Sequence, residues 1–87
     1  MAKKVNKEPT RVEVEIYGVT YPLRSTEDED YVKNLAKMVD DKMKMVATNT
    51  GSFSGTRIAV IAALELADDY MKLKKDYDEL MTLIDEK

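Results

Sequence analysis

Cysteine, histidine and tryptophan are all absent from this chain of 87 residues. The absence of cysteine excludes disulfide bonds and thiolate metal sites, and the absence of histidine removes the commonest metal ligand and general base. No glycine-rich phosphate loop is present either. Adjacent carboxylates such as Asp40 and Asp41 diverge by about 100° on a helix, so they do not converge on one reaction centre. We therefore predict that the chain is not an enzyme and uses no cofactor or metal.

Long apolar runs are also missing. The longest is IAVIAAL at 58–64, which is far shorter than the roughly 20 residues that span a bilayer. The first ten residues lack the apolar region of a secretory signal. We therefore expect a soluble cytoplasmic protein without a membrane partner.

Basic residues are fewer than acidic residues, 14 against 17, which gives a net charge of -3. Three lysines fall within the first ten residues, so the remainder is more acidic still. A general nucleic-acid binder has the opposite sign. A ribbon-helix-helix DNA-binding protein has a similar element order, but Glu13 and Glu15 occupy the strand face that would have to read the DNA. We expect no nucleic-acid partner.

Strict alternation of apolar and polar residues begins at RVEVEIY, residues 11–17, and predicts a half-buried strand. Gly18 and Val19 then fit a two-residue turn with glycine at the position that requires positive φ, and TYPLR at 20–24 forms the second strand. This turn predicts the following pairs across the hairpin: Ile16 with Tyr21, Val14 with Leu23, and Glu13 with Arg24.

An amphipathic helix follows the hairpin. Ser25 or Thr26 offers an N-cap, and the acidic run at 27–30 suits the positive end of a helix dipole better than it suits a cation site, because no EF-hand spacing follows. Apolar residues recur at three- and four-residue spacing: Val32, Leu35, Val39, Met43 and Val46. The pattern predicts a helix of about 21 residues that ends near Ala47.

A second helix begins after the loop at 48–55, where Ser54 is a candidate N-cap, and neither glycine nor proline interrupts residues 56–87. The helix opens on IAVIAAL, which is apolar around its whole circumference and so needs more than one neighbour. We expect its own hairpin and first helix to cover one side and a second subunit another. The predicted dimer core contains Ile58, Ile61 and Leu64, and we expect no stable folded monomer.

Beyond this run the apolar pattern narrows to alternating three- and four-residue steps, which predicts an intermolecular coiled coil. After Ala63, the seam of this coil consists of Leu66, Tyr70, Leu73, Tyr77, Leu80 and Ile84. Tyr70 and Tyr77 occupy a positions of the heptad repeat, where small or branched apolar residues pack best. Their bulk leaves a looser or higher-order bundle open as an alternative to a tight dimer. Asp69 and Lys74 would face each other in a parallel pair, which favours parallel helices.

Three motifs in this order resemble one family: IYG at 16–18, VDDKM at 39–43 and RIAVIAALELADDY at 57–70. The family is ZapA, the Z-ring-associated bacterial cell-division proteins. The resemblance implies a non-enzymatic, cytoplasmic protein at the midcell division site that binds the tubulin-like protein FtsZ and bundles its protofilaments. It also implies homodimers that form through the globular heads and the start of the long helix. These dimers are expected to pair into homotetramers through their coils, with heads at opposite ends.

Basic residues near the hairpin turn and in the loop between the helices carry the FtsZ contact in that family. Val19 follows the turn glycine here, so that position does not transfer. Because FtsZ is expected to be acidic and this chain is acidic as well, local cations must make the contact, and the candidates are Arg24, Lys42, Lys44 and Arg57. Each has a structural alternative, such as an ion pair or a helix C-terminus.

The chain is thus predicted to consist of a disordered tail at 1–10, a dimerisation head at 11–64 and a coiled-coil extension at 65–87. The partners that we expect are FtsZ and a second copy of the chain. The alternative function is that of a homo-oligomeric coiled-coil adaptor for a different protein.

Overall fold

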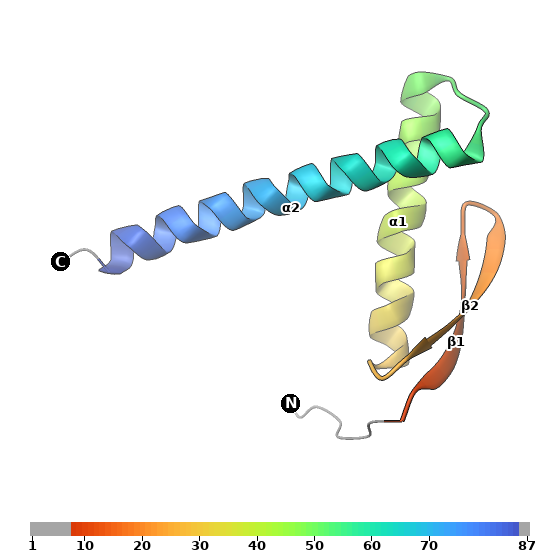
Figure 1. The fold of residues 1–87 in the computed structure, drawn as a ribbon, viewed down its shortest axis with the longest axis horizontal. Helices are drawn as coiled ribbons and strands as arrows, with labels where there is room; N and C mark the ends of the chain where they lie inside the picture. The colour runs from red at the N-terminus through yellow and green to blue at the C-terminus, as the bar shows by residue number, and fades with distance from the viewer. Residues whose placement is uncertain (1–7, 86–87) are drawn as a thin grey trace.

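The computed structural model describes residues 8–85. Two antiparallel strands, β1 (Thr10–Ile16) and β2 (Val19–Ser25), precede two helices, α1 (Glu29–Thr50) and α2 (Gly55–Asp85). Figure 1 shows the hairpin beside α1, and α2 crossing α1 before it projects away. The predicted α+β order of hairpin, helix and long helix is confirmed. Residues 1–7 of the predicted tail lie outside the described residues, and Thr10 already belongs to β1.

The hairpin turns one residue earlier than the sequence predicts. Tyr17 and Gly18 are the turn residues, with φ of 50° and 81°, and Ile16 pairs with Val19. Positive φ at both central residues defines a type I′ turn, whose twist matches that of the strands. The prediction of Gly18 and Val19 as the turn is therefore wrong. It assumed that only the glycine adopts positive φ, whereas Tyr17 does so as well.

The register differs from the prediction but keeps the apolar side chains on one face, because each partner moves by two residues. The three apolar pairs are Val12 with Leu23, Val14 with Tyr21, and Ile16 with Val19. The predicted pair of Glu13 and Arg24 does not form. Arg24 lies opposite Arg11, whose guanidinium contacts Glu13 at 3.3 Å.

Asp40 on α1 holds the hairpin turn. The Tyr17 backbone N–H donates to Asp40 Oδ1 at 2.6 Å, and Lys44 Nζ contacts Asp40 Oδ2 at 2.9 Å. A bulky residue rarely adopts positive φ, so the turn at Tyr17 depends on contacts from outside the hairpin. The Lys44 ammonium and then the Tyr17 N–H lower the pKa of the Asp40 carboxyl below its ordinary value.

The N-terminus of α1 lies later than predicted. Asp28 is the N-cap, because its carboxylate accepts the Asp30 N–H at 3.1 Å. Ser25 Oγ instead accepts the Glu27 N–H at 2.9 Å, in the connection before the helix. The prediction of Ser25 or Thr26 as the cap is therefore wrong.

The C-terminus of α1 lies three residues beyond the predicted end at Ala47. Gly51, with φ of 70°, donates its N–H to the Ala47 carbonyl and closes the helix after Thr50. The buried face of α1 consists of Val32, Ala36, Met43 and Val46. Leu35, which the sequence pattern assigned to this face, is exposed.

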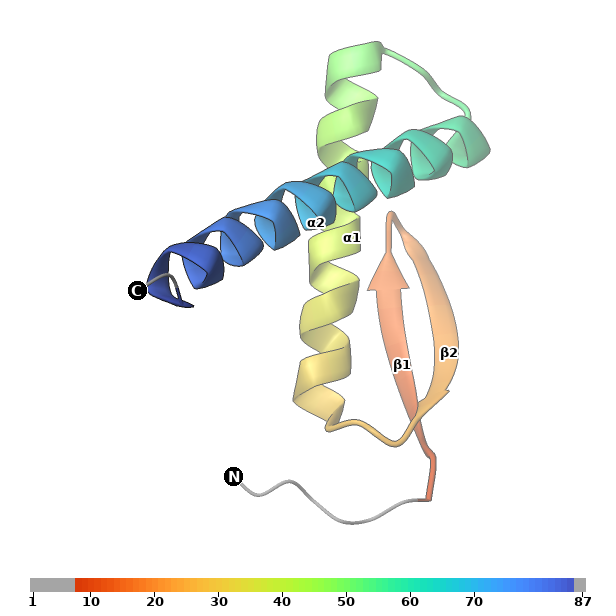
Figure 2. The ribbon, with the colours of Figure 1, turned by 60° about the vertical axis from the view of Figure 1, so that its left-hand side comes forward.

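Two small apolar clusters hold the elements together. One joins the hairpin to the first half of α1, and the other joins the second half of α1 to α2 through Met43, Val46, Ile58 and Ala62. Ile16 packs against both clusters. Figure 2 shows the same arrangement from a second direction, with the hairpin on α1 and α2 across it.

Ser54 caps α2 as predicted, since its Oγ accepts the Arg57 N–H at 3.2 Å. The helix contains 31 residues, so it is about 46 Å long. The molecule measures 52 × 39 × 14 Å along its principal axes, and most of α2 has no neighbour within the chain. We call β1, β2, α1 and the first turns of α2 the head, and the rest of α2 the rod.

We expect the Asp40→Asn substitution to destabilise the fold near neutral pH but not in acid. Because folding lowers the pKa of Asp40, its stabilising contribution is complete above the ordinary carboxyl pKa of about 4 and is lost as the pH falls through the lower folded value. The Tm difference between the parent chain and the variant should therefore shrink as the pH falls below the ordinary carboxyl pKa and disappear in strong acid, as measured by circular dichroism.

Asp41→Asn is the matched control, because Asp41 is the next carboxylate along α1 and pairs only with the exposed Lys37 among the contacts of residues 8–85. If the Tm difference from the parent chain were equal in size and pH dependence for both variants, the contact of Asp40 with Tyr17 would contribute nothing to stability.

Candidate functional site

The start of α2 divides its apolar residues among different faces. Ile58 and Ala62 are buried in the chain's own core, and Ile61 is half-buried beside them. Leu64, in contrast, is 65% exposed. The three residues predicted as a dimer core therefore do not share a surface: Ile58 faces the head, and Leu64 faces away from it. Their role in a dimer stays a prediction.

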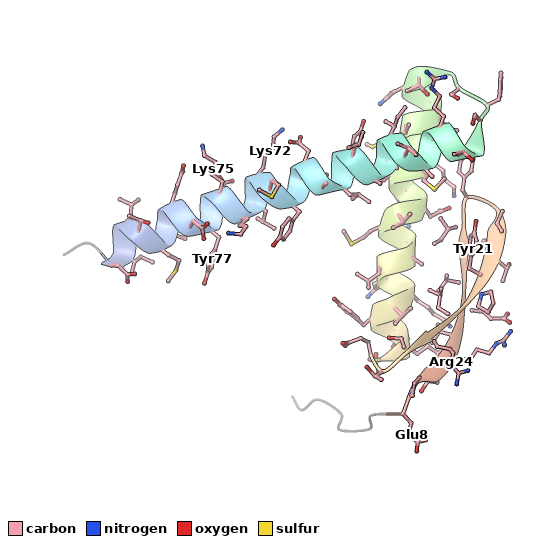
Figure 3. The ribbon with its side chains drawn as sticks, in the orientation of Figure 1. Glu8, Tyr21, Arg24, Lys72, Lys75 and Tyr77 are labelled. Atoms are coloured by element: carbon pink, nitrogen blue, oxygen red, sulfur yellow. The ribbon has the colours of Figure 1, made fainter. Side chains whose placement is uncertain are left out.

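The predicted seam lies along the rod and is uncovered in the single chain. Leu66 is half-buried, and the other members are all more than half exposed: Tyr70, Leu73, Tyr77, Leu80 and Ile84. Figure 3 shows Tyr77 on one side of α2, with Lys72 and Lys75 on the other. These lysines pair with carboxylates one turn along the helix and form a solvated face. The rod is therefore amphipathic, and its apolar stripe has no partner in the chain.

The four candidate contact residues lie at different places on the head. Lys44 pairs with Asp40, and Lys42 contacts two carboxylates of α2. Within residues 8–85, the side chains of Arg24 and Arg57 take part in no ion pair. Figure 3 places Arg24 towards the open end of the hairpin. Arg57 lies in the first turn of α2, next to Thr56, which lines a groove together with Tyr17 and Val19.

Lys42 joins the two helices where the rod leaves the head. Its Nζ lies 3.3 Å from Asp69 Oδ2 and 3.8 Å from Glu65 Oε1, and its side chain is only 19% exposed. Glu65 and Asp69 are one turn apart, so a single ammonium contacts two successive turns of α2. The position therefore suits a residue that fixes the angle between α1 and α2.

Sequence reasoning missed two apolar surfaces on the head. An open groove of about 580 Å³ lies between β2 and the first turns of α2, lined by residues that include Val19, Tyr21, Leu23, Met43, Thr56 and Ala59. A stripe on α1 consists of Tyr31, Leu35, Met38 and Met45, all of them exposed. The steps of 4, 3 and 7 residues along α1 were readable in the sequence, but the stronger pattern of the buried face obscured them.

The loop between the helices carries a third missed feature, Phe53, which is 100% exposed. It is the only phenylalanine of the chain, and it lies four residues before Arg57. Exposed aromatic and arginine side chains are over-represented where protein partners bind. No pattern in the sequence separates an exposed phenylalanine from one that packs in a loop, so only the structure reveals it.

Residues 8–85 contain no group of three acidic side chains placed to hold a metal ion. No helix in that range is long and apolar enough to cross a membrane. The apolar groove opens to solvent, and its lining includes no carboxylate or lysine. The surfaces that stand out are thus apolar stripes and isolated arginines, which are features of protein contact.

A small α+β head with a long, unpartnered amphipathic helix defines a class of elongated proteins that present an apolar seam. A family model described as Cell division protein ZapA matches residues 12–87, and the chain belongs to this family. This result confirms the resemblance found from the three sequence motifs.

The relatives that match this chain include two with the name Cell division protein ZapA that cover most of it. The one from Geobacillus sp. (strain WCH70) is 36% identical over 75 residues, which cover 86% of each chain. The one from Bacillus mycoides (strain KBAB4) is 36% identical over 78 residues, which cover 90% of this chain and 85% of the relative.

Two solved structures share the fold. A ZapA mutant dimer from Geobacillus stearothermophilus is 29% identical and matches with a TM-score of 0.72, covering 99% of this chain and 100% of that one. An unknown conserved bacterial protein from Pseudomonas aeruginosa PAO1 is 22% identical and also has a TM-score of 0.72, covering 87% of this chain and 85% of that one.

We expect Lys42→Met to loosen the junction between the helices. Methionine keeps the apolar stem but removes both ion pairs, and we expect a loss of about 0.5 kcal/mol in the free energy of unfolding. The loss should shrink at about 1 M NaCl, where charges are screened within a few ångströms. Urea unfolding at low and high salt measures both effects.

Lys37→Met is the control, because Lys37 pairs with Asp41 within α1 and does not contact α2. A salt-independent loss at Lys42, or an equal loss at Lys37, would contradict a role for the ion pairs between the helices.

Proposed function

We propose that this chain binds FtsZ at the midcell division site in the cytoplasm and cross-links its protofilaments as a homo-oligomer, without catalytic activity. Membership of the ZapA cell-division family supports the process. The observation that supports cross-linking by a homo-oligomer is the rod, because its apolar seam has no partner within the chain.

Self-association follows from the size of the uncovered surface. The seam extends over three heptads of α2, and a heptad stripe of this kind is stable in water only against another helix. The structurally similar protein from Geobacillus stearothermophilus is itself a dimer. We therefore assign residues 11–64 to a dimerisation head and residues 65–87 to a coiled-coil extension.

Cross-linking depends on valency. A monomeric binder decorates a filament but does not join two filaments. Two heads held by one rigid assembly turn the second contact into an intramolecular step with a high effective concentration. The projecting rod supplies the distance between contacts that bridging needs.

Arg57 is the leading candidate for the FtsZ contact, because its guanidinium has no ion pair in the described residues and Phe53 lies exposed in the same region. Arg24 is the second candidate. The two arginines come from different elements, Arg24 from β2 and Arg57 from the first turn of α2. Lys42 and Lys44 rank lower, since carboxylates of the chain already hold them.

We expect the parent chain to co-pellet with polymerising FtsZ and to thicken the filaments. Arg57→Glu should weaken this co-pelleting about tenfold or more, because it reverses a charge that faces an acidic partner. Sedimentation over a range of protein concentrations measures the apparent affinity.

Arg24→Glu is the matched comparison, since it makes the same charge change near the end of β2. A larger effect of Arg24→Glu would move the contact to that end. If the parent chain does not co-pellet at any salt concentration, FtsZ is not its partner, and an adaptor for a different protein is the better account.

The double variant Leu80→Asp, Ile84→Asp should separate dimerisation from higher assembly. Both side chains are exposed near the end of the rod, so the head and the first heptads remain intact. We expect folded dimers in sedimentation velocity, and filaments that bind the variant but bundle at least severalfold less in electron micrographs. Bundling equal to that of the parent would show that dimers alone bridge filaments.

A further inference from the structure

The hairpin has two outer edges, and they differ in what they offer to another strand. Ile16 and Val19 flank the two-residue turn, so they exchange both of their main-chain hydrogen bonds. Hydrogen-bonded and non-hydrogen-bonded pairs alternate along an antiparallel ladder, and the main-chain groups of the latter point outward. The outward-pointing pairs are therefore Glu15 with Thr20, Glu13 with Pro22, and Arg11 with Arg24.

Pro22 blocks the outer edge of β2. It lies in the middle of β2 at an outward position, and proline has no N–H to donate. The outer edge of β1 keeps a complete row of donors at Arg11, Glu13 and Glu15. Within residues 8–85, no hydrogen bond to another element engages these three N–H groups. The edge of β1 is therefore the one at which a further strand can pair.

A hollow of about 290 Å³ lies beside this edge, between β1 and α1. Its lining includes Glu13 and Glu15 from the strand, and Lys33, Ala36 and Lys37 from the helix. The buried valines of β1 pack on α1, and Figure 2 shows β1 on the side of the hairpin nearer to α1. A strand added at this edge would therefore lie on α1, as β1 does, rather than project into solvent.

The hollow lies on the opposite side of α1 from the exposed apolar stripe. Lys33 and Lys37, which line the hollow, are each two positions from Leu35 of the stripe. Two positions turn a helix by about 200°. A second subunit that packs on the stripe therefore leaves the edge of β1 accessible.

Charge determines which strand suits this edge. Glu13 and Glu15 are exposed, and their side chains lie about 7 Å apart on the face of β1 that points away from α1. Lysine or arginine at alternate positions of an added strand would lie directly across from both carboxylates. The side chains between them would lie over Ala36 and the apolar stems of the two lysines, which favours small or branched apolar residues.

The edge of β1 in a second copy of the chain is a poor occupant. Pairing along the whole of β1 would set Glu13 across from Glu13 at the centre, where like charges repel. Paired strands lie about 4.8 Å apart, whereas packed helices need about 8 to 10 Å. Because each β1 lies on its own α1, two copies would bring their α1 helices too close. An extended segment without a helix beneath it avoids both conflicts.

We propose that the outer edge of β1 binds an extended basic segment of a partner protein by strand addition. The segment forms a third strand, antiparallel to β1, with lysine or arginine across from Glu13 and Glu15. This site is separate from the proposed FtsZ contact, in which arginines of this chain meet an acidic surface. The head would thus present one contact for an acidic partner and another for a basic one.

The capped peptide SKVRVTS is the probe for this site. An antiparallel alignment sets its lysine across from Glu15, its arginine across from Glu13 and its threonine across from Arg11. The N–H of the peptide's arginine then donates to the Glu13 carbonyl, whereas the N–H of the valine that follows points away from β1. Two further peptides carry a methyl group on one or the other of these backbone nitrogens and keep the same charge.

Titration calorimetry with the full chain measures the dissociation constant of each peptide. We expect methylation at the arginine nitrogen to weaken binding at least tenfold more than methylation at the valine nitrogen, because only the former removes a hydrogen bond to β1. Equal weakening by the two methyl groups, or no binding of the unmethylated peptide at millimolar concentration, overturns strand addition.

Amide hydrogen exchange, followed by NMR, reports the same contact from the side of the protein. We expect the exchange of the Arg11, Glu13 and Glu15 amides to slow at least tenfold with saturating peptide, and unchanged exchange contradicts the pairing. Slow exchange of these amides without peptide that becomes slower with protein concentration would show that another copy occupies the edge, which also overturns the proposal.

A charge-reversal variant tests the preference for a basic segment. Glu13→Lys, Glu15→Lys should weaken peptide binding at least tenfold at low salt. Asp68→Lys, Glu79→Lys is the matched control, because it makes the same change in net charge on the solvated face of the rod. Equal losses of affinity in the two variants would contradict a site at β1. Circular dichroism checks that both variants fold, and if the β1 variant does not, the methylated peptides decide the question on the parent chain.

Discussion

The crossing of α1 and α2 is the contact on which the rest of the molecule depends. Ile58 and Ala62 meet Met43 and Val46 there, and no other buried cluster joins the rod to the head among the described residues. The cluster is small, so the direction of a helix of about 46 Å rests on a few side chains and on Lys42. The same cluster includes Ile16 and Tyr17 at its edge, so the hairpin turn and the helix crossing stabilise each other.

A short chain with a long helix has more apolar surface than its own elements cover. β2 illustrates the excess: its three apolar side chains pair with buried or half-buried residues of β1 but remain exposed themselves. The stripe on α1, the groove and the seam are further parts of the same excess. In a chain of this size, apolar surface that stays uncovered also means that the core of the head is thin.

The sequence predicts the elements well because each has a strong period or cap. Alternation in β1, the apolar face of α1 and the cap at Ser54 all agree with the structure. The predictions are wrong at the hairpin turn and at the N-cap of α1, where the local sequence permits two conformations. Glycine at position 18 permits either of two turns, and the one that forms is decided by Asp40, which is 23 residues from Tyr17. The N-cap likewise lies at Asp28 because Ser25 is engaged in a turn of its own.

The candidate sites were harder to predict, because a charge pattern does not tell which side of a helix meets another element. Lys42 and Lys44 look alike in the sequence, yet one reaches α2 and the other holds Asp40. The run IAVIAAL shows the same limit. Its composition indicates more than one neighbour, but only the structure shows that Ile58 is buried in the head and that Leu64 is 65% exposed. One continuous helix therefore supplies part of the core of the head at its start and forms the projecting rod over the rest of its length.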